Sequence, residues 1–266
     1  MNYNLTVEPH NGKSIDIPDK SVVILIGKNG AGKSKILESL KGQMGVSVFL
    51  RGNYETVQEI QTINMASSEG DQVRNETPVL TSSIVASNPE LLKIFQFYFK
   101  SLFDIELKVD NNVFVTNSIN MSREADGLKS LFNLTYYLLS PHKVLLLDEP
   151  ERFFHPSLSS LFLSLISEIA TNYEKKIVIT THTPELMRFD LKNIRIYRIS
   201  NKPSSIFNVN DWITPITNPT YNDAKSIQSF KDWFFFHSDV VFAKHSVLVE
   251  GYSDSITLEA LKQKLS

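Results

Sequence analysis

The chain has 266 residues, of which 42% are hydrophobic and 21% charged, enough for one large core and part of a second domain. Lysine and arginine number 27 against 29 aspartates and glutamates, which gives a formal charge of −2. There is no basic tail or lysine-rich run, so any nucleic-acid binding must come from a local patch or an assembled surface. The absence of cysteine excludes disulfides, thiolate metal sites and cysteine nucleophiles.

The sequence carries no pattern typical of export or of a membrane span. Its first residues lack a basic stretch followed by an apolar one, and no apolar run approaches the length of a spanning helix. The longest candidate, Trp233 to Phe242, is short and is interrupted by His237 and Asp239. We therefore expect a cytoplasmic protein without a membrane segment.

The first elements are predicted from alternation and spacing. Residues 3–8 and 13–18 alternate apolar and polar side chains around Asn11-Gly12, which predicts a hairpin. The apolar run 21–26 predicts a buried strand, and residues 35–40 have the spacing of a helix. Another strand is expected at 46–50.

A phosphate-binding sequence of the form G-x-x-x-x-G-K-[ST] lies between that buried strand and that helix. Lys33 is expected to reach the β- and γ-phosphates of a nucleotide, and the Ser34 hydroxyl to ligate Mg²⁺. A simple glycine turn would leave the flanking strand and helix unexplained. The residues expected to contact a nucleoside triphosphate are Gly27, Lys28, Asn29, Gly30, Ala31, Gly32, Lys33, Ser34 and Lys35.

The rest of the chain alternates helical and strand patterns. After a polar stretch from 51 to about 77, helices are predicted at 89–99, 127–139 and 156–170, and strands at 105–109, 113–116, 144–147, 177–180 and 194–199, the last at a sheet edge. Residues 201–225 are rich in proline and asparagine and predict a linker or irregular cap.

Two acids follow the fully apolar strand 144–147. Asp148 at its carboxyl end can hold Mg²⁺ through water, as the second acidic element of phosphate-loop NTPases does. Glu149 is then placed to polarise the water that attacks the γ-phosphate. A solvated acidic strand end is the alternative, and the phosphate loop argues against it.

The next predicted strand ends in Thr180-Thr181-His182-Thr183. A lone histidine is usually a packing or surface residue. His182, however, follows a strand expected to neighbour the acidic one, and ligands bind at the carboxyl ends of such strands. His182 is therefore predicted to sense the γ-phosphate.

The order of these motifs, with a long insertion between Lys33 and Asp148, resembles ATPases of the ABC class, and in particular the branch that serves DNA repair and phage defence. That branch has a signature sequence at a helix start, which contacts the nucleotide of the opposite subunit. The candidate here is Ser122 to Leu131, in which only Gly127 aligns cleanly with the transporter pattern. A glycine at a helix start still offers N–H groups to phosphate, although an ordinary capped helix would look the same.

Near the end, Leu248-Val249-Glu250-Gly251-Tyr252-Ser253-Asp254 resembles the first strand of a Toprim domain. Such a site clusters carboxylates around Mg²⁺ or Mn²⁺ near a phosphodiester. Glu250 and Asp254 would supply two ligands, and the helix 256–265 would complete the first β–α unit. Later acids would have to lie beyond Ser266. The alternative is a strand and helix with incidental acids.

Taken together, the motifs resemble the overcoming-lysogenisation-defect (OLD) family of ATPase–nucleases. The resemblance implies an α/β ABC-type P-loop ATPase with a mixed β-sheet and an inserted helical subdomain, followed by the start of a Toprim domain. The expected boundaries are 1–200 for the ATPase (with an insert at 51–125), 201–245 for a linker with an aromatic segment, and 246–266 for the Toprim start.

The family also implies a homo-oligomer that acts on DNA in antiphage defence, with a possible partner protein or nucleic acid as trigger. Two other hypotheses are compatible with the motifs: an ABC-type repair ATPase without nuclease activity, and a nucleotide-gated scaffold that hardly hydrolyses ATP. Glu149 argues against the scaffold, and the degenerate signature argues against a transporter subunit.

Overall fold

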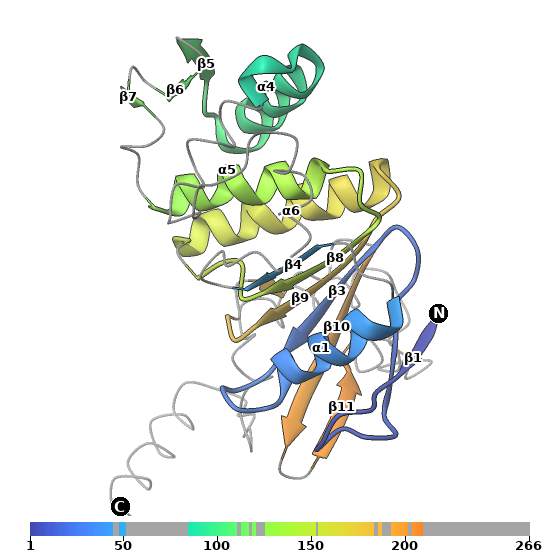
Figure 1. The fold of residues 1–266 in the computed structure, drawn as a ribbon. Coiled ribbons are helices and arrows are strands. Elements are labelled where there is room, and N and C mark those ends of the chain that lie inside the picture. The colour runs from blue at the N-terminus through green and yellow to red at the C-terminus, as the bar shows by residue number, and fades with distance from the viewer. Residues whose placement is uncertain are drawn as a thin grey trace, which may run out of the picture.

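A computed structural model describes residues 1–44, 48–51, 85–110, 113–116, 119–120, 126–152, 154–183, 186–187, 193–201 and 204–209. Its centre is a six-stranded sheet with the order β11-β10-β3-β9-β8-β4 (Figure 1). The strands are β3 (Ser21–Ile26), β4 (Val48–Arg51), β8 (Val144–Asp148), β9 (Lys176–Thr181), β10 (Ile194–Asn201) and β11 (Ser204–Asn208). Every neighbouring pair is parallel except β10 and β11, so the sheet is mixed.

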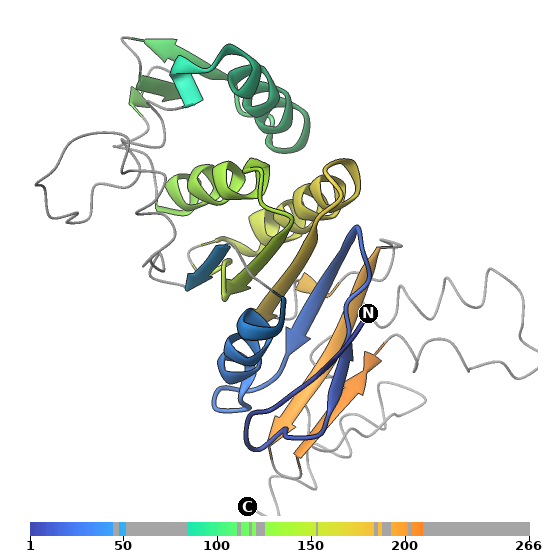
Figure 2. The ribbon, with the colours of Figure 1, turned by 45° about the vertical axis from the view of Figure 1, so that its right-hand side comes forward.

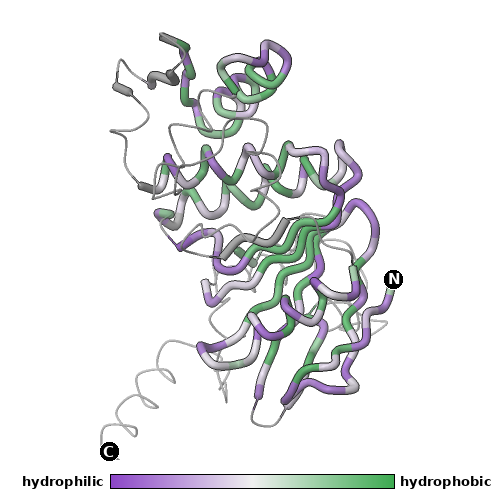
Figure 3. The backbone as a smooth tube through the Cα atoms, viewed as in Figure 1, coloured by the Kyte–Doolittle hydropathy of each residue, from purple (hydrophilic) through white to green (hydrophobic). Residues whose placement is uncertain are grey.

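Helices cover both faces of this sheet. Helix α1 (Lys33–Met44) lies on one face, and α5 (Asp126–Leu139) and α6 (Pro156–Asn172) lie on the other (Figures 1 and 2). Strand β3 accordingly divides its side chains between two cores: Val22, Ile24 and Ile26 pack on the α5–α6 side, and Val23 and Leu25 pack on the α1 side. A parallel sheet covered on both faces requires continuously apolar strands, which Figure 3 shows as a hydrophobic centre.

The insertion between β4 and α5 contains a helix and a small sheet. Helix α4 (Pro89–Phe103) begins after Asn88, whose side chain accepts hydrogen bonds from two backbone N–H groups of the first turn. It packs on α6, and its Phe95 and Phe99 rings contact the Phe132 ring of α5. Strands β5 (Leu107–Asp110), β6 (Val113–Thr116) and β7 (Ile119–Asn120) form an antiparallel sheet beside it (Figure 1).

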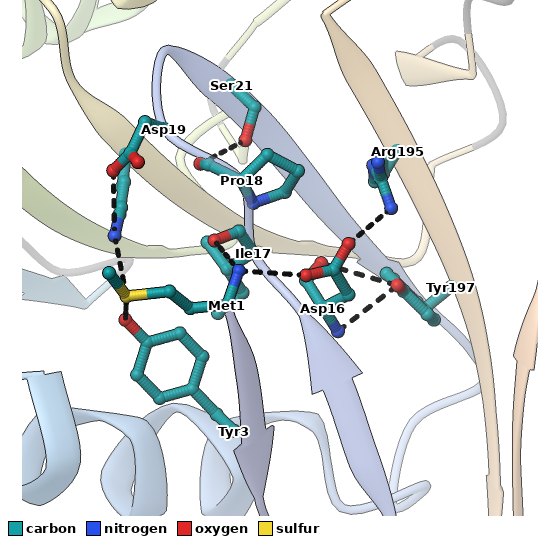
Figure 4. Close-up of polar contacts among 10 residues, drawn as sticks. Met1, Tyr3, Asp16, Ile17, Pro18, Asp19, Ser21, Arg195 and Tyr197 are labelled. Atoms are coloured by element: carbon teal, nitrogen blue, oxygen red, sulfur yellow. Dashed lines mark hydrogen bonds and ion pairs between the residues drawn. The ribbon is translucent and has the colours of Figure 1, made fainter.

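The N-terminal hairpin forms hydrogen bonds with strand β10 of the main sheet. Strands β1 (Asn2–Asn4) and β2 (Ser14–Asp16) pair antiparallel, as the alternation predicts, with a longer loop than Asn11-Gly12 alone. Asp16 accepts hydrogen bonds from the Met1 amine (3.0 Å) and from Arg195 of β10, and its backbone N–H donates to the Tyr197 hydroxyl (Figure 4). The end of β2 is thereby held against β10.

The predicted helices and central strands are confirmed with ends shifted by a few residues, but two expectations fail. Strand β10 is internal, because β11 covers it as the sheet edge. That strand occupies part of the segment expected to be a linker. All five of its residues are only half-buried, and backbone pairing to β10 holds it, so its sequence shows no strong strand pattern.

Other predictions fall outside the described residues: the polar stretch 52–77, most of the linker, the aromatic segment 233–242 and the Toprim-like tail. Within the described part, no helix is long and apolar enough to cross a bilayer.

Candidate nucleotide site

The phosphate loop turns from β3 into α1 as the sequence predicts. Gly30 and Gly32 both have positive φ (77° and 95°), a region that side chains with a Cβ rarely adopt. Gly27 is needed for space, since a Cβ there would lie 2.5 Å from the carbonyl oxygen of Ile199 in β10. The loop therefore exposes the first N–H groups of α1, where helix geometry and dipole favour an anion.

Lys33 lies inside this loop, with only 6% of its surface exposed. Its Nζ donates to the carbonyl oxygens of Gly27 (2.8 Å) and Lys28 (3.3 Å). Burial lowers the pKa of Lys33, and the nearby carboxylates of Glu149, Asp148 and Glu151 oppose that shift. These two backbone carbonyl oxygens thus hold the ammonium at the loop, and we expect a bound phosphate to replace them as its partner.

One side chain from the hairpin loop and one from β10 form hydrogen bonds with carbonyl oxygens of the phosphate loop. His10, fully buried in the hairpin loop, contacts the carbonyl oxygen of Ala31 through Nε2 at 2.8 Å. Asn201, at the end of β10, donates to the carbonyl oxygen of Gly30 at 2.7 Å. Sequence reasoning missed both, because neither residue belongs to a recognisable motif.

Strands β8 and β9 bring the predicted acids and the histidine together at the carboxyl ends of the parallel strands. Asp148 is level with Thr180 in the register, and it accepts a hydrogen bond from the Thr180 hydroxyl. Glu149 has φ 51°, which is uncommon for a residue with a side chain. Its backbone N–H bonds both the carbonyl oxygen and the hydroxyl of Thr180, each at 3.1 Å. These bonds fix the turn after β8 against the end of β9.

The side chains of Glu149 and His182 meet across the two strand ends. Oε1 of Glu149 lies 3.0 Å from Nδ1 of His182. The histidine side chain is 47% exposed and the glutamate 29%, so both remain accessible. The carboxylate predicted to polarise water and the ring predicted to sense the γ-phosphate therefore lie side by side.

These two residues line a pocket of about 550 Å³ that begins at the phosphate loop. Asn29 lies on its loop side, while Glu151, Arg152, Phe154, Ser159 and Thr183 complete the wall. Glu151 is 4% exposed, and its Oε1 accepts a hydrogen bond from the Thr181 hydroxyl. Glu151 was not singled out from the sequence, although an acid two residues after Glu149 was a signal that could have found it.

The other predicted site residues are placed differently. Ser34 and Lys35 are exposed at the start of α1, where the Ser34 hydroxyl is accessible to a cation. Gly127 is half-buried at the second residue of α5, at a helix start as expected. Glu250 and Asp254 lie outside the described residues.

The residues present fit a Mg²⁺–nucleotide. The loop offers N–H donors and the Lys33 cation for phosphate, and Ser34 and Asp148 offer the oxygen ligands that Mg²⁺ prefers alongside water and phosphate. Their roles remain predictions.

Comparison with known proteins finds similarity to ATP-binding proteins. A family model described as "AAA domain, putative AbiEii toxin, Type IV TA system" matches residues 87–188, less than half of the chain. The methionine import ATP-binding protein MetN 1 of Acinetobacter baylyi is 24% identical over 186 residues, covering 65% of this chain and 51% of that protein. The chain thus spans about half the length of that relative.

A second relative is the OLD nuclease of Thermus scotoductus, 25% identical over 127 residues, which are 45% of this chain and 22% of that protein. Among solved structures, the SMC head domain from Thermotoga maritima has a TM-score of 0.48 at 16% identity, covering 74% of this chain and 93% of that one.

The fold is the α/β fold of ABC-type ATPases, with a mixed sheet and a phosphate loop between β3 and α1. The chain is similar to an OLD nuclease over less than half of its length.

Proposed function

We propose that this chain is the Mg²⁺-dependent ATP-hydrolysing module of an OLD-type nuclease that acts on DNA in antiphage defence, with the ATP state controlling assembly or cleavage. The observation that carries the ATPase part is the 3.0 Å contact between Glu149 and His182 at adjacent strand ends, beside the phosphate loop. The similarity to an OLD nuclease and the sequence around Glu250 support the nuclease part.

Each residue has a defined task in this proposal. The N–H groups of the loop and Lys33 bind the phosphates, and Ser34 and Asp148 hold Mg²⁺, which neutralises charge on the β- and γ-phosphate oxygens when bound. Glu149 accepts a proton from the attacking water. His182 holds the Glu149 carboxylate through Nδ1 and senses the γ-phosphate through Nε2.

Replacement of Glu149 by glutamine tests the hydrolysis. Glutamine keeps the size of the side chain but removes the charge that accepts the proton, so kcat is expected to fall about 10²- to 10⁴-fold. ATP binding, measured with a fluorescent analogue, should persist. Glu106→Gln, the same substitution at an exposed site of the inserted subdomain, is the control. Wild-type turnover in Glu149→Gln would assign the proton acceptor to another residue.

The nuclease part has a separate test, in a protein that includes the sequence after Ser266. Glu250 and Asp254 are proposed to bind divalent metal together with acids that follow, so the metal cluster would activate water against a phosphodiester. Glu250→Ala should abolish Mg²⁺- or Mn²⁺-dependent DNA cleavage and leave ATP hydrolysis in place. The 266-residue chain should bind ATP without cutting DNA. Equal cleavage by Glu250→Ala and wild type would favour an ABC-type ATPase without a Toprim nuclease.

A further inference from the structure

A buried carboxyl lies directly behind the Glu149–His182 pair. Glu151 belongs to the turn that follows β8, in which the N–H of Arg152 bonds the carbonyl oxygen of Glu149 (3.3 Å) and that of Phe154 bonds the carbonyl oxygen of Glu151 (2.7 Å). Its Oε1 accepts from the Thr181 hydroxyl. Its Oε2 is buried and has no hydrogen-bond partner of ordinary geometry among the residues that the structure describes. A buried carboxyl with one oxygen uncommitted calls for a functional explanation.

The bond from Glu151 reaches the backbone that carries His182. The Thr181 hydroxyl donates to Glu151 and also accepts the backbone N–H of Thr183 at 2.9 Å. The hydroxyl therefore clips together the residues on either side of His182. Because Glu149 and Glu151 share one turn, the clip fixes the histidine relative to Glu149 across the gap between β8 and β9.

The hydrogen bond from Thr181 does not depend on an ionised Glu151. Burial raises the pKa of the Glu151 carboxyl, the polar groups of Thr181 and Thr183 act in the opposite direction, and the charge of Glu149 adds to the rise. Protonated or ionised, the carboxyl offers an oxygen that accepts from the Thr181 hydroxyl. A glutamine amide oxygen offers the same acceptor.

We propose that Glu151 is a positioning residue for hydrolysis, which holds His182 against Glu149 through the Thr181 hydroxyl. This inference rests on the proposed ATPase activity. Its location supports a role beyond stability, because Glu151 lines the same pocket as Glu149 and His182. The carboxyl itself does not have to touch the nucleotide.

Three variants test the role in steady-state hydrolysis: Glu151→Ala, Glu151→Gln and Thr181→Val. Loss of positioning by about 1 Å costs on the order of 10²-fold in rate, so Glu151→Ala and Thr181→Val should each lower kcat by roughly ten- to a hundredfold. KM and the affinity for a fluorescent ATP analogue should stay within about twofold, since neither residue lies in the phosphate loop. Glu151→Gln should recover at least about a third of the wild-type kcat.

The double variant Glu151→Ala/Thr181→Val adds a test of the connection. If both residues act through one hydrogen bond, the double variant should be no slower than the worse single variant. Multiplicative losses would place Glu151 and Thr181 in separate roles. A fall of kcat in Glu151→Gln to the level of Glu151→Ala would overturn the hydrogen bond from Thr181 as the positioning contact, and an unchanged kcat in Glu151→Ala would overturn the positioning role itself.

Hydrogen exchange of the segment 177–183 separates this inference from the proposed function. In Glu151→Ala the amide of Thr183 should exchange faster than in wild type, and in Glu151→Gln it should stay protected, whether or not the protein hydrolyses ATP. Wild-type protein without ATPase activity would refute the proposed function alone. Unchanged protection in Glu151→Ala would refute the clip, even in an active enzyme.

Discussion

Lys33 carries the ammonium that we propose binds the phosphates. Its ammonium is buried in the loop against two carbonyl oxygens, and burial lowers its pKa, while three carboxylates nearby favour the charged form. The lysine is thus partly desolvated before any ligand arrives, and a phosphate would meet a cation with few water molecules to displace.

Replacement of Lys33 by alanine removes this cation. We expect at least a tenfold loss of affinity for Mg²⁺–ATP, which corresponds to about 1.4 kcal/mol. Titration with a fluorescent nucleotide measures it, and Lys13→Ala, an exposed lysine in the hairpin loop, serves as the control. If folded Lys33→Ala binds the nucleotide as tightly as wild type, the site has been assigned to the wrong loop.

At the scale of elements, a second buried lysine joins two loops at the opposite end of the sheet. Lys175, 2% exposed, precedes β9, and its Nζ donates to the carbonyl oxygens of Ser140 and His142 in the connection from α5 to β8. Burial, and to a lesser degree the charge of Lys143, lowers the pKa of Lys175 to about 8. The lysine thus aligns the starts of the two strands whose far ends carry Glu149 and His182.

This lowered pKa makes stability depend on pH in a predictable direction. Between about pH 8 and pH 10 the unfolded chain keeps the proton on Lys175 and the folded chain releases it, so the free energy of unfolding should rise with pH. The slope contributed by this residue is at most about 1.4 kcal/mol per pH unit. Urea unfolding of wild type and Lys175→Met at pH 7.5, 8.5 and 9.5 measures it.

The methionine variant keeps an apolar stem but has no titrating group, so the stability difference between the two proteins should change across that range. Tyr98 and Tyr137, whose pKa burial raises to about 12, are common to both proteins and cancel in the difference. Parallel stability curves would show that Lys175 titrates alike in folded and unfolded chains.

In the whole molecule, the site lies at the carboxyl ends of the parallel strands, and its pocket opens to the surface. We expect this opening to be completed by a second copy, whose Gly127 at the start of α5 would face the bound ATP. The functional unit would then be at least a dimer, and both nucleotides would lie between subunits.

Assembly can be tested in the Glu149→Gln background, where ATP should persist. Gly127→Arg is expected to abolish ATP-dependent dimers in analytical ultracentrifugation, because a bulky side chain would block the approach of phosphate to the helix start, while ATP binding within one subunit remains. Gly42→Arg is the matched control, since a Cβ at this exposed position of α1 meets no atom within 4 Å. A strictly monomeric protein at every ATP concentration would contradict the expected dimer.

Much of the site could be predicted because its motifs are local. The phosphate loop depends on glycines next to a strand and a helix, and Asp148 and Glu149 follow directly on a buried apolar strand. Since adjacent parallel strands end at one edge, the proximity of His182 to Glu149 also followed from the order of elements. The α/β class rests on the same alternation of apolar strands and amphipathic helices.

The phosphate loop, the acidic strand end and the fold class could be predicted without the structure, because each is a property of residues close together along the chain. The folded structure was needed to show that β10 is internal, that His10 and Asn201 bond the phosphate loop, and that Glu151 accepts from Thr181. These contacts join residues distant in sequence, whose side chains carry no periodic signal. Strand order and the packing of both sheet faces bring them together, and hydrogen bonds hidden from water then hold them in place.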